Sequence, residues 1–323
     1  MDLRPVAFIV GVLMMILAAA MTLTALIALA DQSQDWQAFL ASAAITLFIG
    51  VALLLTTQGK KSSLSLKEAF VMTVAIWLTI AVFGSLPFLL SVEGMSLADA
   101  FFESMSGVTT TGSTVMVGLD DTPHGILLWR ALLQWFGGVG IIVMAVSFLP
   151  MLQVGGMQLF KTEAFDQTEK ILPRAAEIAV AILTLYCAFT AVGAILLWLA
   201  GMSPFDAVVH AMTSLATGGF SSHDASIGYF NSALIDWVVV FLMIVGSLPF
   251  AVFLVALRVG IKPFVEDGQI FTFLILLGSA IGAMVIWLVW SQGFNLGTAV
   301  RYSAFNVTSI MTGTGYSTAN YGT

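Results

Sequence analysis

Repeated long apolar runs constrain this chain more than any other feature of its sequence. They lie near residues 5–30, 37–57, 69–90, 125–150, 175–200, 234–257 and 270–290. A run of about 20 apolar residues is long enough to cross the ~30 Å hydrocarbon core of a bilayer as an α-helix. Only 9% of the 323 residues are charged, too few to hydrate the surface of a soluble domain of that length. We therefore predict an all-α polytopic membrane protein embedded in a lipid bilayer.

The basic residues indicate which way the chain is oriented. Nine of the eleven Lys and Arg residues lie at the N-terminus or in alternate loops. The intervening segments 31–36, 91–124 and 201–233 contain acidic residues and no Lys or Arg. Cytoplasmic loops of membrane proteins are enriched in Lys and Arg, so we expect the N-terminus and the basic loops to face the cytoplasm.

The acidic side carries an internal repeat that aligns without gaps. Its copies are DAFFESMSGVTTTGST (99–114), DAVVHAMTSLATGGFS (206–221) and YSAFNVTSIMTGTGYS (302–317). The alignment superimposes Gly112 on Gly219 and Gly315. Each copy follows an apolar run, and the first two also precede one. The repeating unit is thus a span, a short helix, an oxygen-rich loop and a span, in parallel orientation.

Each copy begins with the pattern of a short helix. In the first two copies, Ser96 and Ser203 each precede an acidic residue by three positions, which is typical of a helix N-cap. The third copy has Tyr302 at the aligned acidic position, so its helix start is less clear. About ten residues later, each helix is expected to end in the Thr/Gly stretch.

These neutral, oxygen-rich loops predict an ion-selectivity filter. Non-helical backbone at membrane depth is tolerated only where it is buried in protein or lines a water-filled cavity. Glycine lets the main chain adopt dihedral angles that aim carbonyl oxygens at one axis, and these oxygens can replace the water shell of a monovalent cation. The predicted ion-binding residues are Thr109, Thr110, Thr111, Gly112, Ser113, Ala216, Thr217, Gly218, Gly219, Phe220, Thr312, Gly313, Thr314, Gly315 and Tyr316.

Polar residues outside the loops are candidates for supporting the filter. Glu103, His210 and Asn306 share one aligned position, nine residues before each filter glycine. We expect them to hydrogen-bond to the filter backbone or to a neighbouring helix; the alternative is that they are unrelated polar residues at the outer interface.

Arg130 lies at the start of an apolar run, where a cation needs a partner. Its candidate partners are Glu103, Asp120 and Asp121, and we expect the pairing to be structural. Arg301 is expected to extend its charged end to the membrane surface. The sequence FGGVG at 136–140 lies within an apolar run and indicates close helix packing, not a nucleotide-binding loop.

The third loop, TGTGYS, resembles the T-V-G-Y-G filter of potassium channels. The whole chain resembles the Trk/Ktr/HKT superfamily of potassium transporters, in its bacterial Trk-type (TrkH-like) branch. The segments that carry this resemblance are FFESMSGVTTTGST, LLQWFGGVGIIVMAVSFLPML (132–152), VGGMQLF (154–160), GGFSSHDASIGYF (218–230) and NVTSIMTGTGYST (306–318).

The resemblance implies a fold of four pseudo-fourfold repeats around one pore. It divides the chain into a two-span N-terminal extension (1–61), a first pore repeat (62–152), a second (153–258) and a third that lacks its second span (259–323). A fourth repeat would be missing, so we expect the sequence to be a C-terminally incomplete part of a longer protein.

The resemblance also implies potassium uptake across the bacterial inner membrane. Transport would be channel-like, driven by the membrane potential and gated by a cytoplasmic, nucleotide-binding (RCK-type) subunit. A homodimer is implied, with potassium as substrate, no cofactor in this chain and no nucleic acid partner. In plant members, Ser in place of the first filter glycine accompanies sodium permeation; here the residue is Gly112.

Other functions remain as alternatives. The chain could be a sodium-permeable or cation-coupled (symport) transporter of the same superfamily, or a non-functional fragment. Secondary transporters of other folds usually have inverted repeats, whereas these repeats are parallel. No apolar run pairs His with Asp or Cys, or one carboxylate with another, so we do not expect an enzyme. The single Cys187 is expected to be a small buried apolar residue.

Overall fold

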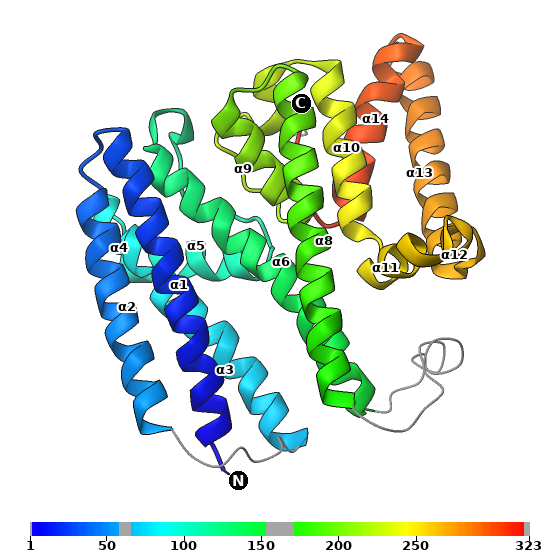
Figure 1. The fold of residues 1–323 in the computed structure, drawn as a ribbon. Coiled ribbons are helices and arrows are strands. Elements are labelled where there is room, and N and C mark those ends of the chain that lie inside the picture. Colours follow the sequence, from blue (N-terminus) through cyan, green and yellow to red (C-terminus); the bar gives the residue numbers. More distant parts are fainter. Residues whose placement is uncertain (1, 58–65, 153–170, 320–323) are drawn as a thin grey trace.

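The computed structural model describes residues 2–57, 66–152 and 171–319, and the regular elements in these ranges are all helical (Figure 1). The predicted all-α architecture is therefore observed. The α-helices are α1 (Arg4–Ala30), α2 (Trp36–Thr56), α3 (Leu66–Gly84), α4 (Leu86–Ser91), α5 (Leu97–Val108), α6 (His124–Leu152), α8 (Ile171–Leu199), α9 (Pro204–Leu215), α10 (Ala233–Ser247), α11 (Phe250–Val259), α12 (Lys262–Glu266), α13 (Gly268–Gln292) and α14 (Leu296–Met311). Short 3₁₀ helices cover Leu119–Asp121 and Ser226–Phe230.

Several of these helices can cross a bilayer. By length and composition, five spans qualify among the described residues: α1, α2, α3 together with α4, α8 and α13. The bent pair α10 and α11 is a sixth if its two helices form one span. The predicted run at 125–150 forms α6, but the side chains of most of its residues beyond 140 lie outside the described part of the chain. The protein is thus a multi-pass membrane protein.

The predicted run at 234–257 is not one straight span. α10 ends at Ser247, and α11 leaves it at an angle of 92°. The reason is local: Leu248 precedes a proline and is extended, with φ −81° and ψ 150°. The ring of Pro249 disfavours helical dihedrals in the residue before it and supplies no N–H to continue the helix.

One arrangement recurs along the chain. A long helix is followed by a short one that ends in a Thr/Gly segment: α3 and α4 precede α5, α8 precedes α9, and α13 precedes α14. After the first two segments the chain continues into α6 and α10. The division into repeats at residues 61, 152 and 258 remains a prediction.

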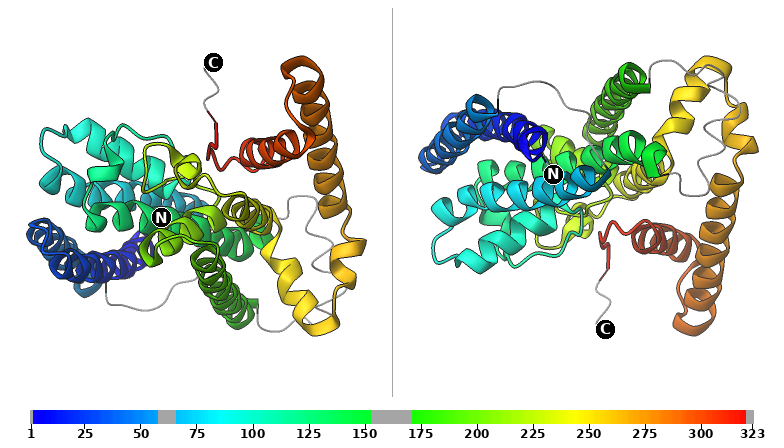
Figure 2. Two further views of the ribbon diagram at one scale, coloured as in Figure 1. Left: turned by 90° about the horizontal axis from the view of Figure 1, so that it is seen from above. Right: turned by 90° about the horizontal axis from the view of Figure 1, so that it is seen from below.

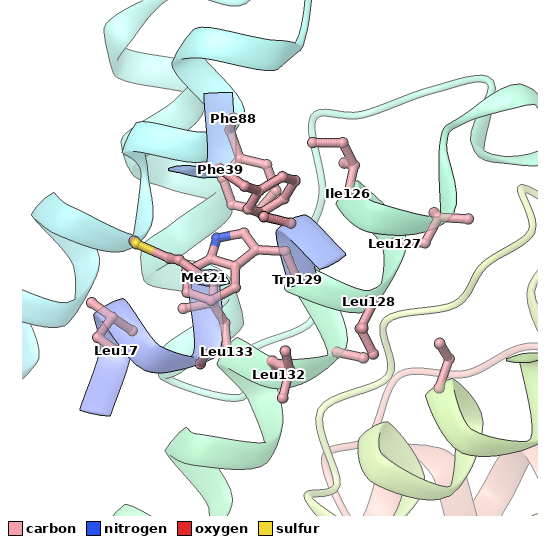
Figure 3. Packing of buried hydrophobic residues seen from close by; sticks show 14 of the residues in the cluster. Leu17, Met21, Phe39, Phe88, Ile126, Leu127, Leu128, Trp129, Leu132 and Leu133 are labelled. Atoms are coloured by element: carbon pink, nitrogen blue, oxygen red, sulfur yellow. The ribbon is translucent and has the colours of Figure 1, made fainter. Parts of the chain in front are cut away.

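The first repeat is anchored on Trp129 of α6, which is fully buried. Its ring meets Phe39 of α2 edge to face, with centroids 6.1 Å apart, and Met21 of α1 lies beside it (Figure 3). Its Nε1 donates a hydrogen bond of 2.9 Å to the carbonyl of Gly84, where α3 gives way to α4. This core fixes α6 against the N-terminal helices, and α6 in turn reaches the Thr/Gly segments.

The C-terminal helices lie at one edge of the molecule. α13 packs against α14, and the end of α14 returns toward the segment that follows α9 (Figure 2). On α8, Cys187 is exposed, so the expectation that it is buried is wrong. A small apolar residue on a span can face outward, because the surroundings of a membrane helix are themselves apolar.

Candidate functional site

The short helices that lead to the Thr/Gly segments begin at side-chain caps. Ser96 Oγ accepts a hydrogen bond from the amide of Asp99, and Ser203 Oγ accepts one from Asp206, as the sequence predicts. The third helix starts earlier than the alignment suggests. Asn295 caps α14 by accepting from the amide of Thr298 at 2.9 Å, about one turn before the aligned start. The alignment did not reveal the N-cap of the third copy because this helix is longer and begins before the aligned position.

The three short helices end in the same way. In each, the chain passes through a left-handed residue: Thr110 (φ 55°), Thr217 (φ 50°) and Gly313 (φ 76°). The next amide reaches back five residues to a helix carbonyl at 2.9 Å, from Thr111 to Ser106 in the first copy. Equivalent bonds join Gly218 to Thr213 and Thr314 to Ser309. This Schellman ending turns the chain sharply out of the helix.

We call residues 109–113, 216–220 and 312–316 the first, second and third Thr/Gly segments. Their aligned glycines all have positive φ: Gly112 80°, Gly219 79° and Gly315 85°. The left-handed region favours glycine because other residues clash there through Cβ. The segments therefore share one backbone conformation, although their side chains differ.

The glycines also allow neighbouring segments to touch. A Cβ built on Gly112 would lie 2.1 Å from the carbonyl oxygen of Gly218, and one on Gly219 would lie 1.8 Å from that of Thr314. Gly218 and Thr314 are aligned residues, so the first segment meets the second as the second meets the third. A Cβ on Gly315 would meet no atom of the described chain within 4 Å.

Hydroxyl groups brace the first and third segments internally. Thr109 and Thr111 share a hydrogen bond of 2.8 Å between their Oγ1 atoms, and Thr312 and Thr314 share one of 2.7 Å. In the same two copies, a helix serine donates to the carbonyl of the residue after the glycine: Ser106 to Ser113 and Ser309 to Tyr316.

The second segment has Ala216 and Gly218 at the aligned threonine positions and is braced by its neighbours instead. Gln134 of α6 donates from Nε2 to the carbonyl of Gly218 at 2.6 Å and accepts from the amide of Phe220 at 3.0 Å. Tyr316 of the third segment donates from Oη to the carbonyl of Phe220 at 3.2 Å. Gln134 was not among the site residues predicted from the sequence. The available signal was an uncharged polar residue within an apolar run, one helical turn from Arg130.

The three aligned residues predicted to support the filter all reach the chain just after their own segment. Glu103 Oε1 accepts from Thr114 Oγ1 at 2.8 Å, and Asn306 Nδ2 donates to Thr318 Oγ1 at 3.1 Å. His210 bonds to Ser221 Oγ at 2.9 Å. Its other nitrogen faces the carbonyl of Asp206, which can only accept, so Nδ1 carries the hydrogen and Nε2 accepts from Ser221.

Arg130 joins the first copy to the second. It is 1% exposed and its Nε donates to Glu103 Oε1 at 2.8 Å, so of the three candidate partners the structure pairs it with Glu103. Its Nη1 donates to the carbonyl of Ser221 at 2.8 Å, and its guanidinium lies 4.1 Å from the ring centroid of Phe220. A buried charge is tolerated when it is paired and its hydrogen bonds are satisfied, as here.

One other sequence expectation needs correction. Arg301 does not simply extend to the membrane surface: its Nε donates to Asp236 Oδ2 at 2.6 Å, which ties α14 to α10. His223 lies in a loop but is only 13% exposed. Its ring stacks on that of Tyr229, with ring centroids 3.5 Å apart, and its Nδ1 hydrogen-bonds to Asp120. It therefore connects the loop after the first Thr/Gly segment to the loop after the second.

Asp206 links the start of α9 to the chain after the second segment. It accepts hydrogen bonds of 2.7 Å from Ser203 Oγ and from Ser222 Oγ. Burial raises the pKa of its carboxyl, but these hydrogen bonds, together with the nearby His210 and His223, outweigh burial, and the pKa lies below its usual value.

The oxygen atoms at the meeting point of the segments are neutral. They are main-chain carbonyls and threonine or serine hydroxyls. Among the described residues, no group of three or more His, Cys, Asp and Glu side chains is placed to hold a metal ion. Such an arrangement can replace the hydration shell of a monovalent cation without the strong attraction of carboxylates.

Residues 35–323 match the model of the family TrkH, described as cation transport protein. The chain is 43% identical over 318 residues to the Trk system potassium uptake protein TrkI of Halomonas elongata, covering 98% of this chain and 64% of that protein. It is 43% identical over 250 residues to the Trk system potassium uptake protein TrkH of Escherichia coli, covering 76% of this chain and 52% of that protein.

A solved structure is similar over nearly the whole chain. The crystal structure of the potassium transporter TrkH from Vibrio parahaemolyticus superimposes with a TM-score of 0.91 at 35% identity, covering 99% of this chain and 66% of that one. The chain spans about half to two thirds of the length of these relatives. The members of this family are transport proteins and not enzymes, and the chain belongs to the TrkH family of cation transport proteins.

Proposed function

We propose that the protein conducts potassium inward across the bacterial inner membrane through a filter formed by the three Thr/Gly segments. The observation that carries this proposal is the close approach of two filter glycines to a carbonyl of the next segment, Gly112 to Gly218 and Gly219 to Thr314. Segments in such contact present successive main-chain oxygens to a common axis. The names of the relatives specify potassium uptake.

The chemistry of the segments suits a weakly held cation. Conduction requires that an ion bind well enough to shed water and loosely enough to leave. Carbonyl and hydroxyl oxygens meet both conditions. The C-terminal ends of α5, α9 and α14 lead into the segments, so their negative dipole ends add attraction for a cation without a formal charge.

The driving force in this proposal is the membrane potential. Moving one elementary charge through 100 mV is worth about 2.3 kcal/mol. The acidic segments would then face outward and the basic loops inward, with the N-terminus in the cytoplasm. We further propose a homodimer that is gated by a cytoplasmic nucleotide-binding subunit, as the family resemblance implies.

The second candidate keeps the pathway and changes the ion. A sodium-permeable or cation-coupled transporter could use the same carbonyl oxygens. Glycine at residue 112, where sodium-permeable plant members have serine, favours potassium.

The test is ion uptake by cells that lack their own potassium uptake systems and express the protein from its complete gene. We expect uptake of rubidium, a potassium substitute, to exceed that of sodium. Comparable sodium uptake would favour the second candidate, and uptake of neither ion would overturn the proposal.

A pair of glycine variants tests the filter itself. Gly219→Asp would place a side chain against the carbonyl of Thr314 and a carboxylate among the filter oxygens, so we expect rubidium uptake to be lost. The matched control is Gly118→Asp. Gly118 also has a left-handed backbone (φ 74°), but no atom lies within 4 Å of its Cβ position. Unchanged uptake with Gly219→Asp would show that this segment does not line the pathway.

A further inference from the structure

Gln134 occupies an unusual position for a membrane helix. It lies on α6 of the first repeat, is fully buried, and directs its side chain at the second Thr/Gly segment. Both ends of its amide are used, one as donor to Gly218 and one as acceptor from Phe220. A side-chain amide that bonds a carbonyl and an N–H two residues apart pairs with the backbone as a neighbouring β-strand would.

Gln134 and Gly218 require each other sterically. A Cβ on Gly218 would lie 2.4 Å from Gln134 Cδ. The aligned residues Thr111 and Thr314 carry their side chains at this position, and each shares a hydroxyl hydrogen bond with a second threonine. The second segment lacks both hydroxyls, and Gln134 fills the vacated space.

The bond to Phe220 also fixes the carbonyl of the filter glycine. The N–H of Phe220 and the C=O of Gly219 belong to one planar trans peptide group, in which they point in opposite directions. Because this N–H is directed at Gln134, the carbonyl of Gly219 is directed away from α6. A peptide group without this partner could rotate and withdraw its oxygen from the filter.

We propose that Gln134 is a positioning residue for ion selectivity: it replaces the hydroxyl pair of the other segments and holds the Gly219 carbonyl in its ion-facing orientation. The inference rests on the proposed function, because it assumes that the segments form the ion pathway. The inference adds to the proposed filter a residue of the first repeat, Gln134, that sets the geometry of the second Thr/Gly segment.

The experiment separates hydrogen bonding from packing. Gln134→Met keeps a side chain of similar length without the hydrogen bonds, and Gly218→Ala displaces the amide. The double variant Gln134→Ala/Gly218→Ala restores the space without restoring the hydrogen bonds. Gln292→Met, at the exposed end of α13, is the matched control. Rubidium and sodium uptake are measured for each variant in cells that express the complete gene.

We expect the rubidium-to-sodium ratio to fall about tenfold in Gln134→Met, the factor that corresponds to about 1.4 kcal/mol. The double variant should fold, as its thermal unfolding in detergent would show, and still have the lowered ratio. The control should keep the wild-type ratio.

The outcomes distinguish the two proposals. If the wild-type protein takes up rubidium and the double variant keeps the wild-type ratio, only packing matters and the role of Gln134 is overturned, while the proposed function stands. If the wild-type protein takes up neither ion, the proposed function fails and the role of Gln134 fails with it.

Discussion

At the scale of single residues, buried polar side chains hold the Thr/Gly segments in place through hydrogen bonds to the segments or to the residues that follow them. Arg130 and Glu103 illustrate the physics: both are almost fully buried, yet together with Thr114 and the carbonyl of Ser221 they satisfy one another. Moving a lone charge out of water is costly, and a paired one is tolerated only with good geometry. The segments are therefore fixed by interactions that fail sharply when one member is lost.

Substitutions at Arg130 test this directly. Arg130→Met leaves the Glu103 carboxylate buried and unpaired, so we expect a loss of about 3–5 kcal/mol in the free energy of unfolding. Adding Glu103→Gln removes the stranded charge and should recover part of that loss. Lys262→Met is the control, since it breaks an exposed pair with Glu266 and should cost about 0–1 kcal/mol. Thermal unfolding in detergent measures all three, and equal losses for Arg130→Met and Lys262→Met would contradict the prediction.

Asp206 gives a prediction for pH dependence. Its folded-state pKa lies below the unfolded value, so it contributes stability above the unfolded pKa of about 3.9 that is lost as the pH falls through the lower folded-state pKa. Asp206→Asn should unfold at a lower temperature than wild type at pH 6, and the difference should narrow toward pH 3. A difference that stays constant over this range would exclude the carboxylate as its cause.

Sequence reasoning reached some of these residues and not others. It named Glu103 as a candidate partner of Arg130, because a buried cation needs an anion nearby. It placed Glu103, His210 and Asn306 together because they align. Gln134 has no counterpart in the repeat alignment and no charge that demands a partner. Its role depends on Gly218, which lies 84 residues away in sequence and is brought close only by the fold.

At the scale of elements, the long helix that follows the first or the second Thr/Gly segment packs directly on the C-terminal end of the short helix before that segment. A Cβ on Gly137 of α6 would lie 1.9 Å from the carbonyl of Val108, and one on Gly246 of α10 would lie 2.3 Å from that of Leu215. Val108 and Leu215 are the last residues of α5 and α9. Glycine lets the backbones touch. The long helices α6 and α10 therefore fix the positions of the ends of α5 and α9, where the segments begin.

Two glycines of α6 test this contact. Gly137→Ala should push α6 away from α5, so we expect lower thermal stability and lower rubidium uptake. Gly140→Ala is the matched control in the same helix, because no atom lies within 4 Å of its Cβ position. Where the Cβ position is open, a glycine-to-alanine change in a helix should stabilise by about 1 kcal/mol. Similar behaviour of the two variants would mean that the close approach of α6 has no role.

The elements themselves were largely predictable. Long apolar runs gave the spans, and the Ser caps gave the starts of α5 and α9, since both signals are local. The prediction of close packing at FGGVG agrees with the contact of Gly137. The bend between α10 and α11 was not predicted, although Pro249 was visible, because hydropathy runs through it without interruption.

At the scale of the whole molecule, side-chain contacts join the copies near the acidic segments that connect their helices. The ring of His223 binds Asp120, the amide of Leu119 donates to Asp224, and Arg301 pairs with Asp236. The first two contacts connect loops of the first and second copies, and the third connects the second copy to the third. Each copy is thus stabilised by its neighbour.

The proposed orientation can be tested by labelling. After Cys187→Ser removes the single cysteine, Asp121→Cys should react with a membrane-impermeant maleimide applied to intact cells, because residue 121 lies in a proposed outer loop. Glu266→Cys, between α11 and α13, should react only after the cells are opened. The reverse pattern would invert the proposed orientation.

The charge pattern predicts this orientation, which stays a prediction. It does not predict the contacts between the copies. Asp120 and His223 lie 103 residues apart, and nothing in the local sequence of either residue identifies the other. Parallel repeats indicate that the copies are alike, but the side chains that join them have no counterparts in the alignment.

The support that the second segment receives from its neighbours has a consequence for how such a protein can evolve. In a ring of four identical subunits, a change in one filter segment is a change in all of them. When the segments follow one another in a single chain, each can vary alone. Gln134 and Tyr316 hold the second segment, which has no hydroxyls of its own at residues 216 and 218. Repeats within a single chain thus allow one segment of the proposed pore to acquire chemistry that the others do not share.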